Sequence, residues 1–283
     1  MRPVAGISLA ALLLAVAGCG QDSAPPAPSG SEPELPPIGK VEPGGAFRID
    51  EEKFPEVPVP ADLKPLKWDF APGRHHRYQV TQRLSQVTVA AVGGRRGVTR
   101  SQDRGAGYVE FVAKGDGTAV ARVKIQTRES LIDGRPAPRE AIEQRPPTQF
   151  ECRIDEEGVP PTGRLAAGAS DPRVFRDAFL ALQEGERKSA DGTIRTRIAG
   201  CFKVDRFDCV RLEGEFEIAP ALPSGRTLLR GRSVAWFALR ERRFVRAGMV
   251  IAQAIRTKGR NEKGDWVTRS TDLETEVLLK LVE

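Results

Sequence analysis

The sequence predicts a mainly β protein: a strongly curved antiparallel meander, half-barrel-like, packed on one or two helices. Three observations predict this fold. Apolar and polar residues alternate with a period of two through much of residues 66–283, turn-like or charged segments separate the alternating runs, and a single internal segment has clear helical spacing. Strands that follow one another through turns, without long helical crossovers, favour an antiparallel meander.

The first predicted strand covers residues 77–89. Tyr78, Val80 and Leu84 alternate there with polar residues, which places one face on a core and the other in water. A Gly-rich loop at 93–97 follows, and Gly115-Asp116-Gly117 later joins two runs as a hairpin. The further strands of this half are predicted at 108–114, 118–127 and 149–154.

One segment has the periodicity of a helix. Ser170 or Asp171 is suited to cap it, Pro172 fits its first position, and Gly185 fits its end. The apolar stripe is Val174, Phe175, Ala178, Phe179 and Leu182. We expect this stripe to pack on the sheet as core.

Strands resume after the helix. Residues 240–243, Arg-Glu-Arg-Arg, are predicted to be a hairpin tip. The last run contains Leu273, Val277, Leu278 and Leu281 at a spacing that also fits a C-terminal helix, so both interpretations stay open. The strands of this half are predicted at 193–204, 207–218, 226–239, 244–257 and 266–282.

The N-terminus has the features of an export signal. The apolar run Ile7 to Ala17 is too short to cross a bilayer about 30 Å thick. It ends in Val16-Ala17-Gly18-Cys19, which resembles the lipobox of bacterial lipoproteins. This resemblance implies that residues 1–18 are removed and that Cys19 is acylated on sulfur. The family pattern, with Gly20 in place of Asp, implies retention at the outer membrane, with the domain facing the periplasm or the cell surface.

Residues 19–65 are rich in proline, with Gly, Ser and acidic residues between. Proline fixes φ and lacks the amide hydrogen, so the segment is predicted to be a flexible tether of the extended polyproline type. Ile49 and Phe54, with Phe47, are apolar exceptions that suit contact with the domain, in which case the tether stops near Gly45. Residues 66–283 form the predicted single globular domain.

Two hairpin-like segments carry a second resemblance. The runs V-D-R-F-D-C-V-R-L-E-G and A-W-F-A-L-R-E-R-R-F-V-R-A, within residues 201–254, look like paired hairpins of half-barrel periplasmic lipoprotein carriers. In that group a curved sheet and a helix enclose an apolar cavity, whereas a lipid anchor and a Pro-rich tether depart from its pattern. The cavity lining that this resemblance implies here is Tyr78, Val80, Phe111, Trp236 and Phe244.

Three cysteines, Cys152, Cys201 and Cys209, remain beside the anchor in an oxidising compartment, so at most one internal disulfide can form. An odd-numbered loop centred on Asp205 would place Cys201 opposite Cys209, within disulfide range. A two-residue turn at Asp205-Arg206 would place Cys201 opposite Val210 and point the two sulfurs to opposite faces. Both registers, a bridge from Cys152, and three free buried thiols stay open as alternatives.

No motif for catalysis or for cofactor binding is present. Nucleophile-elbow, phosphate-loop and dinucleotide patterns are absent. The two histidines, His75 and His76, are adjacent and point to opposite faces of a strand, and the acidic turn 155–158 lacks the ligand spacing of a calcium loop. We therefore expect no enzyme, no metal and no cofactor. The net charge of +6 comes mostly from scattered arginines that suit a solvated surface.

Three functions fit these observations. The first is a membrane-anchored envelope lipoprotein with a non-catalytic binding or scaffold domain for a lipid, another apolar ligand or an envelope protein. The second is an envelope hydrolase with a site built from two carboxylates. The third is a structural protein that binds cell wall or a protein partner through arginines. Nucleic acid is excluded as a partner because the export signal removes the chain from it.

Overall fold

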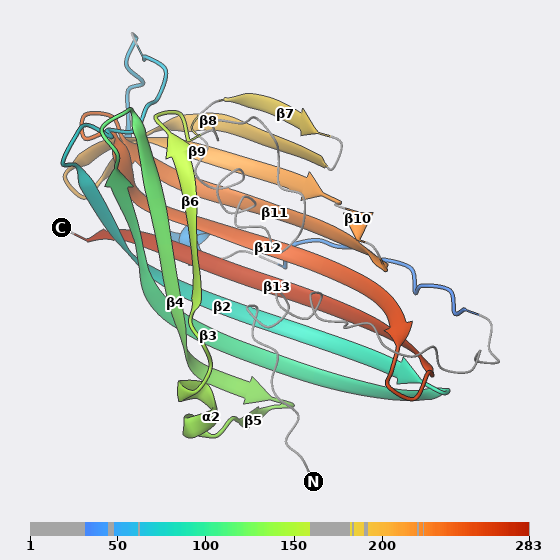
Figure 1. The fold of residues 1–283 in the computed structure, drawn as a ribbon. Coiled ribbons are helices and arrows are strands. Elements are labelled where there is room, and N and C mark those ends of the chain that lie inside the picture. Colours follow the sequence, from blue (N-terminus) through green and yellow to red (C-terminus); the bar gives the residue numbers. More distant parts are fainter. Residues whose placement is uncertain are drawn as a thin grey trace.

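The computed structural model describes residues 32–44, 48–61, 63–158, 182, 184–189, 192–219, 221–222 and 224–282. They form one antiparallel sheet of 13 strands that is not closed, which confirms the curved meander (Figure 1). The strands are β1 (Glu56–Val57), β2 (His75–Val92), β3 (Arg95–Ala113), β4 (Thr118–Ile132), β5 (Arg135–Pro136), β6 (Thr148–Asp155), β7 (Gly185–Ser189), β8 (Gly192–Val204), β9 (Phe207–Ile218), β10 (Ala221–Leu222), β11 (Gly225–Ala238), β12 (Arg243–Arg260) and β13 (Trp266–Val282).

The strand order is β1-β8-β9-β11-β12-β13-β2-β3-β4-β5, with β7 on β8, β10 on β11 and β6 on β4. The C-terminal strand β13 therefore lies between β12 and β2 and joins the two halves of the chain. Its pairing with β2 runs from Val267 opposite Val92 to Val282 opposite Arg77. The alternative of a C-terminal helix is wrong, because both neighbours of β13 supply backbone partners along almost its whole length.

Helices contribute little to the described residues. They contain a 3-10 turn, η1 (Arg48–Glu51), and one short helix, α2 (Arg139–Glu143), in which no residue is buried. The helix predicted from the stripe Val174 to Phe179 lies outside the described residues. Leu182, the last residue of that stripe, is buried, and Gly185, its predicted end, is the first residue of β7.

The two faces of the sheet have different chemistry. One face, here called the core face, carries Val80, Phe111 and Leu279 among its buried side chains. The opposite face, here called the strap face, carries Arg83 and Glu276, which lie directly opposite each other on β2 and β13. This division follows from the two-residue period of a strand, which sends successive side chains to opposite faces.

The two ends of the sheet are also distinct (Figure 1). The cleft end holds the turns between β8 and β9 and between β11 and β12. The hairpin end holds the β2–β3 turn at Gly93–Gly94 and the β12–β13 turn at 261–265, which lie together because Val92 pairs with Val267. The longest strands have 17 to 19 residues, so the two ends are about 60 Å apart.

Much of the predicted tether is part of the fold. The described residues 32–44 and 48–55, here called the strap, run along β12 on the strap face from the hairpin end towards the cleft end. The contacts that mark this path, in order, are Glu32 with Lys258, Pro37 with Arg256, Val41 with Ala252 and Ala254, Glu52 with Arg246, and Phe54 with Trp236.

The described part of the segment that the sequence predicts to be a tether thus contacts the sheet. Proline removes amide hydrogens but leaves carbonyl oxygens, and these accept from arginine and lysine side chains, as Pro37 does from Arg256 and Pro33 from Lys258. The apolar exceptions Ile49 and Phe54 do contact the domain, as expected: Ile49 is buried, and the Phe54 ring meets Trp236 edge-on.

After the strap, β1 adds two residues to the edge of β8, and the chain then crosses to the core face. Leu66, Trp68 and Phe70, here called the plug, are buried there before β2 begins. The N-terminal segment thus covers part of both faces of the sheet.

Candidate functional site

The five residues predicted to line a cavity are all buried core. Tyr78, Val80, Phe111 and Phe244 have no exposed surface, and Trp236 is 1% exposed. The plug occupies the space over the core face: the Trp68 ring stacks on Phe111 at 5.0 Å and meets Phe244 edge-on at 4.6 Å. The predicted open cavity is therefore wrong at these residues, because the chain's own aromatic side chains fill it.

Trp236 also lies on the other face from the remaining four. It pairs with Arg246, and its ring contacts Phe54 of the strap at 5.2 Å and the guanidinium of Arg211 at 5.5 Å. A register shift between Trp236 and Phe237 marks the place, and Phe237 packs on the core face against Phe244. No single cavity can therefore contain all five predicted residues.

Two adjoining clefts open at the cleft end, beside the plug. One has a volume of about 560 Å³ and the other about 490 Å³, and both are lined by Pro60 and Leu239. The first is also lined by Val57, Cys201 and Phe207. The second continues along Leu63, Pro65, Leu66 and Phe237. Both volumes lie within the range of small-molecule sites, about 300–1,000 Å³.

Basic side chains dominate the rims of these clefts. Lys203, Arg206 and Arg240 lie at the first, together with the acids Asp208 and Glu241. Lys203 is neutralised by Asp208 at 2.9 Å. The second cleft has only basic charged residues, Lys64, Lys67 and Arg242.

Two of these basic groups have other partners that fix their positions. Arg242 donates to the backbone carbonyls of Lys67 and Trp68, at 3.0 and 2.9 Å, which ties the β11–β12 turn to the plug. Lys67 lies 3.5 Å from Glu156. Lys64 is exposed at the mouth. The second cleft is therefore an apolar groove with a cationic rim.

The cysteines of β8 and β9 do not form the predicted disulfide. Cys201 lies opposite Val210 and Cys209 lies opposite Phe202, so their side chains are on different faces. The chain adopts the two-residue turn, with Asp205 at a φ of 52°, in place of the odd-numbered loop. Both thiols are free and buried. Cys152 lies in β6, beyond β4 at the other end of the strand order.

These thiols are not activated for chemistry. Burial, with a smaller contribution from Asp208, raises the pKa of Cys201 above its usual value. Burial also raises the pKa of Cys209 to about 12, helped by the nearby carboxylates Glu241, Asp208 and Asp205. Because the thiolate is the nucleophile, both cysteines are unreactive near neutral pH.

The histidines divide between the faces as the strand pattern predicts: His75 is exposed and His76 is 4% exposed. The Nε2–H of His76 donates to the carbonyl of Asp69 at 3.0 Å. Burial lowers the pKa of His76, so the ring is neutral at physiological pH. Across the described ranges, no three His, Cys, Asp or Glu side chains gather closely enough to hold a metal ion.

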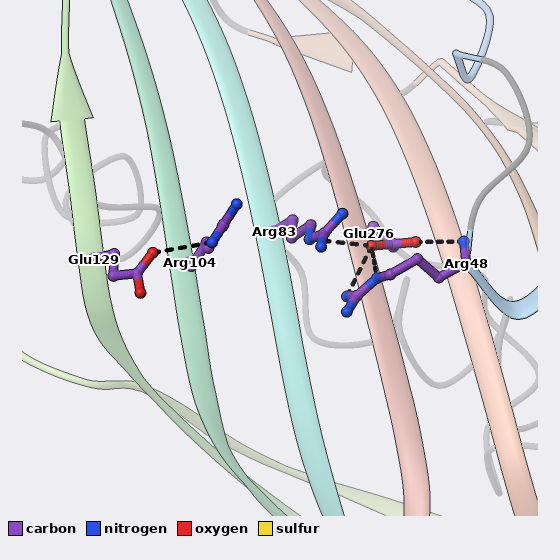
Figure 2. Close-up of polar contacts among 5 residues, drawn as sticks. All are labelled: Arg48, Arg83, Arg104, Glu129 and Glu276. Atoms are coloured by element: carbon purple, nitrogen blue, oxygen red, sulfur yellow. Dashed lines mark hydrogen bonds and ion pairs between the residues drawn. The ribbon is translucent and has the colours of Figure 1, made fainter. Parts of the chain in front are cut away.

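The charged groups of the strap face hold the strap in place (Figure 2). Glu276 is 9% exposed, and its carboxylate accepts from the backbone amide and the Nε of Arg48, each at 2.9 Å. Arg83 approaches the same carboxylate at 3.9 Å. Arg104 and Glu129 form the next pair across β3 and β4, at 3.2 Å and exposed to solvent. Glu276 thus anchors the strap at the middle of the sheet.

Neither a family model nor a curated protein matches this chain. Among solved structures, it is similar to lipovitellin, with a TM-score of 0.39 and 12% identity; the match covers 76% of this chain and only 26% of that one. The outer membrane protease OmpT from Escherichia coli has a TM-score of 0.26 and 10% identity over 75% of this chain and 97% of its own.

A DUF1329 family protein from Desulfovibrio piger has a TM-score of 0.14 and 12% identity, covering 68% of this chain and 83% of its own. All three TM-scores lie below 0.5, so these proteins define no family for the chain. Within the part of the chain that the structure describes, no helix has the length and apolar character of a membrane span.

Proposed function

We propose that the protein is a lipoprotein of the bacterial cell envelope, acylated at Cys19 and held at the outer membrane, with a non-catalytic domain that binds an apolar ligand. The observation that carries the binding role is the second cleft, whose walls are apolar and whose charged rim residues are all basic. This combination suits an amphiphile with an apolar body and an anionic group, such as a fatty acid. The lipobox Val16-Ala17-Gly18-Cys19 supports the anchor.

Binding is favoured over catalysis because the reactive groups near the clefts are inactive. Cys201, the thiol that lines the first cleft, has a raised pKa, and His76 is buried and committed to the carbonyl of Asp69. A hydrolase with two carboxylates would need acids that converge in a cleft. The first cleft has Asp208 and Glu241, and Asp208 is paired with Lys203.

The ligand proposal is tested with the acylated full-length protein in detergent micelles, using cis-parinaric acid as a fluorescent fatty acid. We expect saturable binding by the wild type. Leu239→Arg places a charge in the wall shared by both clefts and should weaken binding by at least tenfold. Leu131→Arg is the matched control, because Leu131 is 36% exposed on β4 and should leave binding unchanged. Equal binding by all three proteins would show that the fatty acid does not bind in the clefts.

The anchor is tested separately by labelling growing cells with radioactive palmitate. The wild type and the control Cys201→Ser should take up label, whereas Cys19→Ser should not. Label on Cys19→Ser, or none on the wild type, would show that the lipobox interpretation is wrong, whatever the clefts bind.

A further inference from the structure

The net positive charge of the chain is concentrated at the hairpin end. Residues 93–100, around the β2–β3 turn, carry three arginines and no acid. Residues 258–269, around the β12–β13 turn, carry four basic and two acidic residues. These two neighbouring tips thus carry a net charge of +5 by sequence, and Glu32, which pairs with Lys258, lowers the net charge of the hairpin end to +4.

The β2–β3 tip is exposed on both faces. Every residue from Gly93 to Arg100 is exposed, and Val98 is 42% exposed, one of the few large apolar side chains in contact with water. The cleft end also carries basic residues, among them the rim of the second cleft, but several others there are paired with acids. Its ion pairs include Arg74–Asp69, Arg153–Asp116 and Lys203–Asp208.

The strap brings the N-terminal end of the described chain to the hairpin end. Its first described residue, Glu32, pairs with Lys258 at 2.5 Å, close to the β12–β13 turn, and Figure 1 shows the strap entering the fold at the hairpin end. Twelve residues lie between Cys19 and Glu32, so even a fully extended chain spans at most about 45 Å from one to the other. The cleft end lies about 50 Å further along the sheet, because 15 residues of β12 separate Lys258 from Arg243.

From these positions we propose that the hairpin end docks on an anionic lipid surface through Arg95, Arg96 and Lys263, with Val98 at the headgroup level. This inference rests on the proposed acylation of Cys19, which keeps the hairpin end within reach of the membrane. Docking would direct the clefts away from the bilayer, towards ligands or partners in the surrounding space.

The arrangement suits this contact because electrostatic attraction to a membrane acts only over short distances. At physiological ionic strength the screening length is about 8 Å, so only charges at the tip contribute. Each basic residue near an anionic surface contributes on the order of 1 kcal/mol, so removal of three should weaken binding roughly 100-fold.

The test measures sedimentation of the unacylated mature chain, from Gly20 onwards, with vesicles of phosphatidylcholine alone or with 30% phosphatidylglycerol. Because the chain lacks the lipid, the result does not depend on whether Cys19 is acylated in cells. We expect binding only to the anionic vesicles, lost on raising salt. Arg95→Gln with Arg96→Gln and Lys263→Gln should abolish it. The control triple variant Lys53→Gln, Arg74→Gln and Lys114→Gln removes three exposed charges elsewhere and should bind as the wild type does.

The depth to which the hairpin end enters the bilayer is tested with the acylated protein in vesicles that contain brominated lipid, which quenches the fluorescence of nearby tryptophan. Trp266 is partly exposed beside the hairpin-end turn, whereas Trp68 and Trp236 are buried towards the cleft end. We expect quenching in the wild type that disappears in Trp266→Phe. Any of three results would overturn the docking proposal. They are equal loss of vesicle binding in both triple variants, no binding to anionic vesicles, and tip-dependent binding to purified cell wall in place of vesicles. The palmitate experiment alone decides the anchor.

Discussion

Substitution of Trp68 by alanine tests whether the plug fills the core face as described. The Trp68 ring has no exposed surface, and its centroid lies 4.6 to 6.4 Å from those of Phe70, His76, Phe111, Phe237 and Phe244. Removing a fully buried Trp typically costs 3–5 kcal/mol, through lost transfer free energy and the cavity left behind. Because five rings hold this side chain and the strands beneath are fixed by their pairing, we expect about 4 kcal/mol.

Urea unfolding followed by circular dichroism measures this loss. The midpoint should fall with the slope unchanged, and the melting temperature should fall by on the order of 10 °C. Trp266→Ala is the matched control, because Trp266 is partly exposed and should cost less than about 2 kcal/mol. The empty space should also accept indole, so added indole should stabilise Trp68→Ala and leave the control unchanged.

A loss below about 1 kcal/mol for Trp68→Ala would refute the reasoning, since a ring packed as described cannot be removed so cheaply. The core face would then be open around Trp68, as the cavity predicted from the sequence requires.

Three other parts of the structure give further predictions: the Arg48–Glu276 pair, Gly107 and Cys209. Arg48→Met and Glu276→Gln should show a coupling free energy of about 1–2 kcal/mol in a double-mutant cycle, because Glu276 is nearly buried while Arg48 is 36% exposed. Each substitution should also speed hydrogen exchange in residues 32–44. Additive effects of the two substitutions would argue against the Arg48–Glu276 contact as the anchor of the strap. Gly107→Ala should destabilise the protein by more than 3 kcal/mol, because its Cβ would lie 1.8 Å from the Lys124 carbonyl oxygen, whereas Gly97→Ala, with nothing within 4 Å, should change unfolding little. Burial raises the pKa of Cys209 to about 12, so the unfolded thiol ionises first as the pH rises through about 9, and stability falls there. Between pH 8 and 10.5, Cys209→Ala should therefore lose about 2 kcal/mol less stability than the wild type, and parallel curves would contradict the assignment.

The alternation of side chains was sufficient to predict most of the sheet. β2, β4, β8, β9, β11 and β12 appear where apolar residues recur every second position, because a strand with one buried face must have that period. The first half of β3 was missed for the same reason. Residues 95–107 carry few apolar side chains, and those near the tip are exposed on both faces, so the pattern there gives no sign of a strand.

The tertiary structure decided the role of the Pro-rich segment. In its described residues the segment forms no α-helix and no central strand, as its composition predicts, but proline carbonyls remain good acceptors. Pro37 lies near Arg256, and Glu52 near Arg246, only because β12 places these arginines at intervals along the strap face. That match links residues about 200 positions apart and leaves no local pattern in the sequence.

Neither the disulfide nor the cavity could be decided from the pattern of residue types. The sequence allowed two registers for Cys201 and Cys209, and the turn at Asp205-Arg206 decided between them. It also identified Tyr78, Val80, Phe111 and Phe244 as apolar side chains on one face, which is correct, but periodicity does not reveal what covers a face.

What the sequence determined by itself is therefore local: the strand period, several of the turns, and the count of charges. What only the tertiary structure decided is which segments meet. It placed Trp68 over the core face, the strap along β12, and the tips around Arg95 and Lys263 side by side, so that charges scattered in the sequence gather at one end. The physical reason is that pairing of long strands fixes neighbours by register, and register depends on contacts between distant parts of the chain.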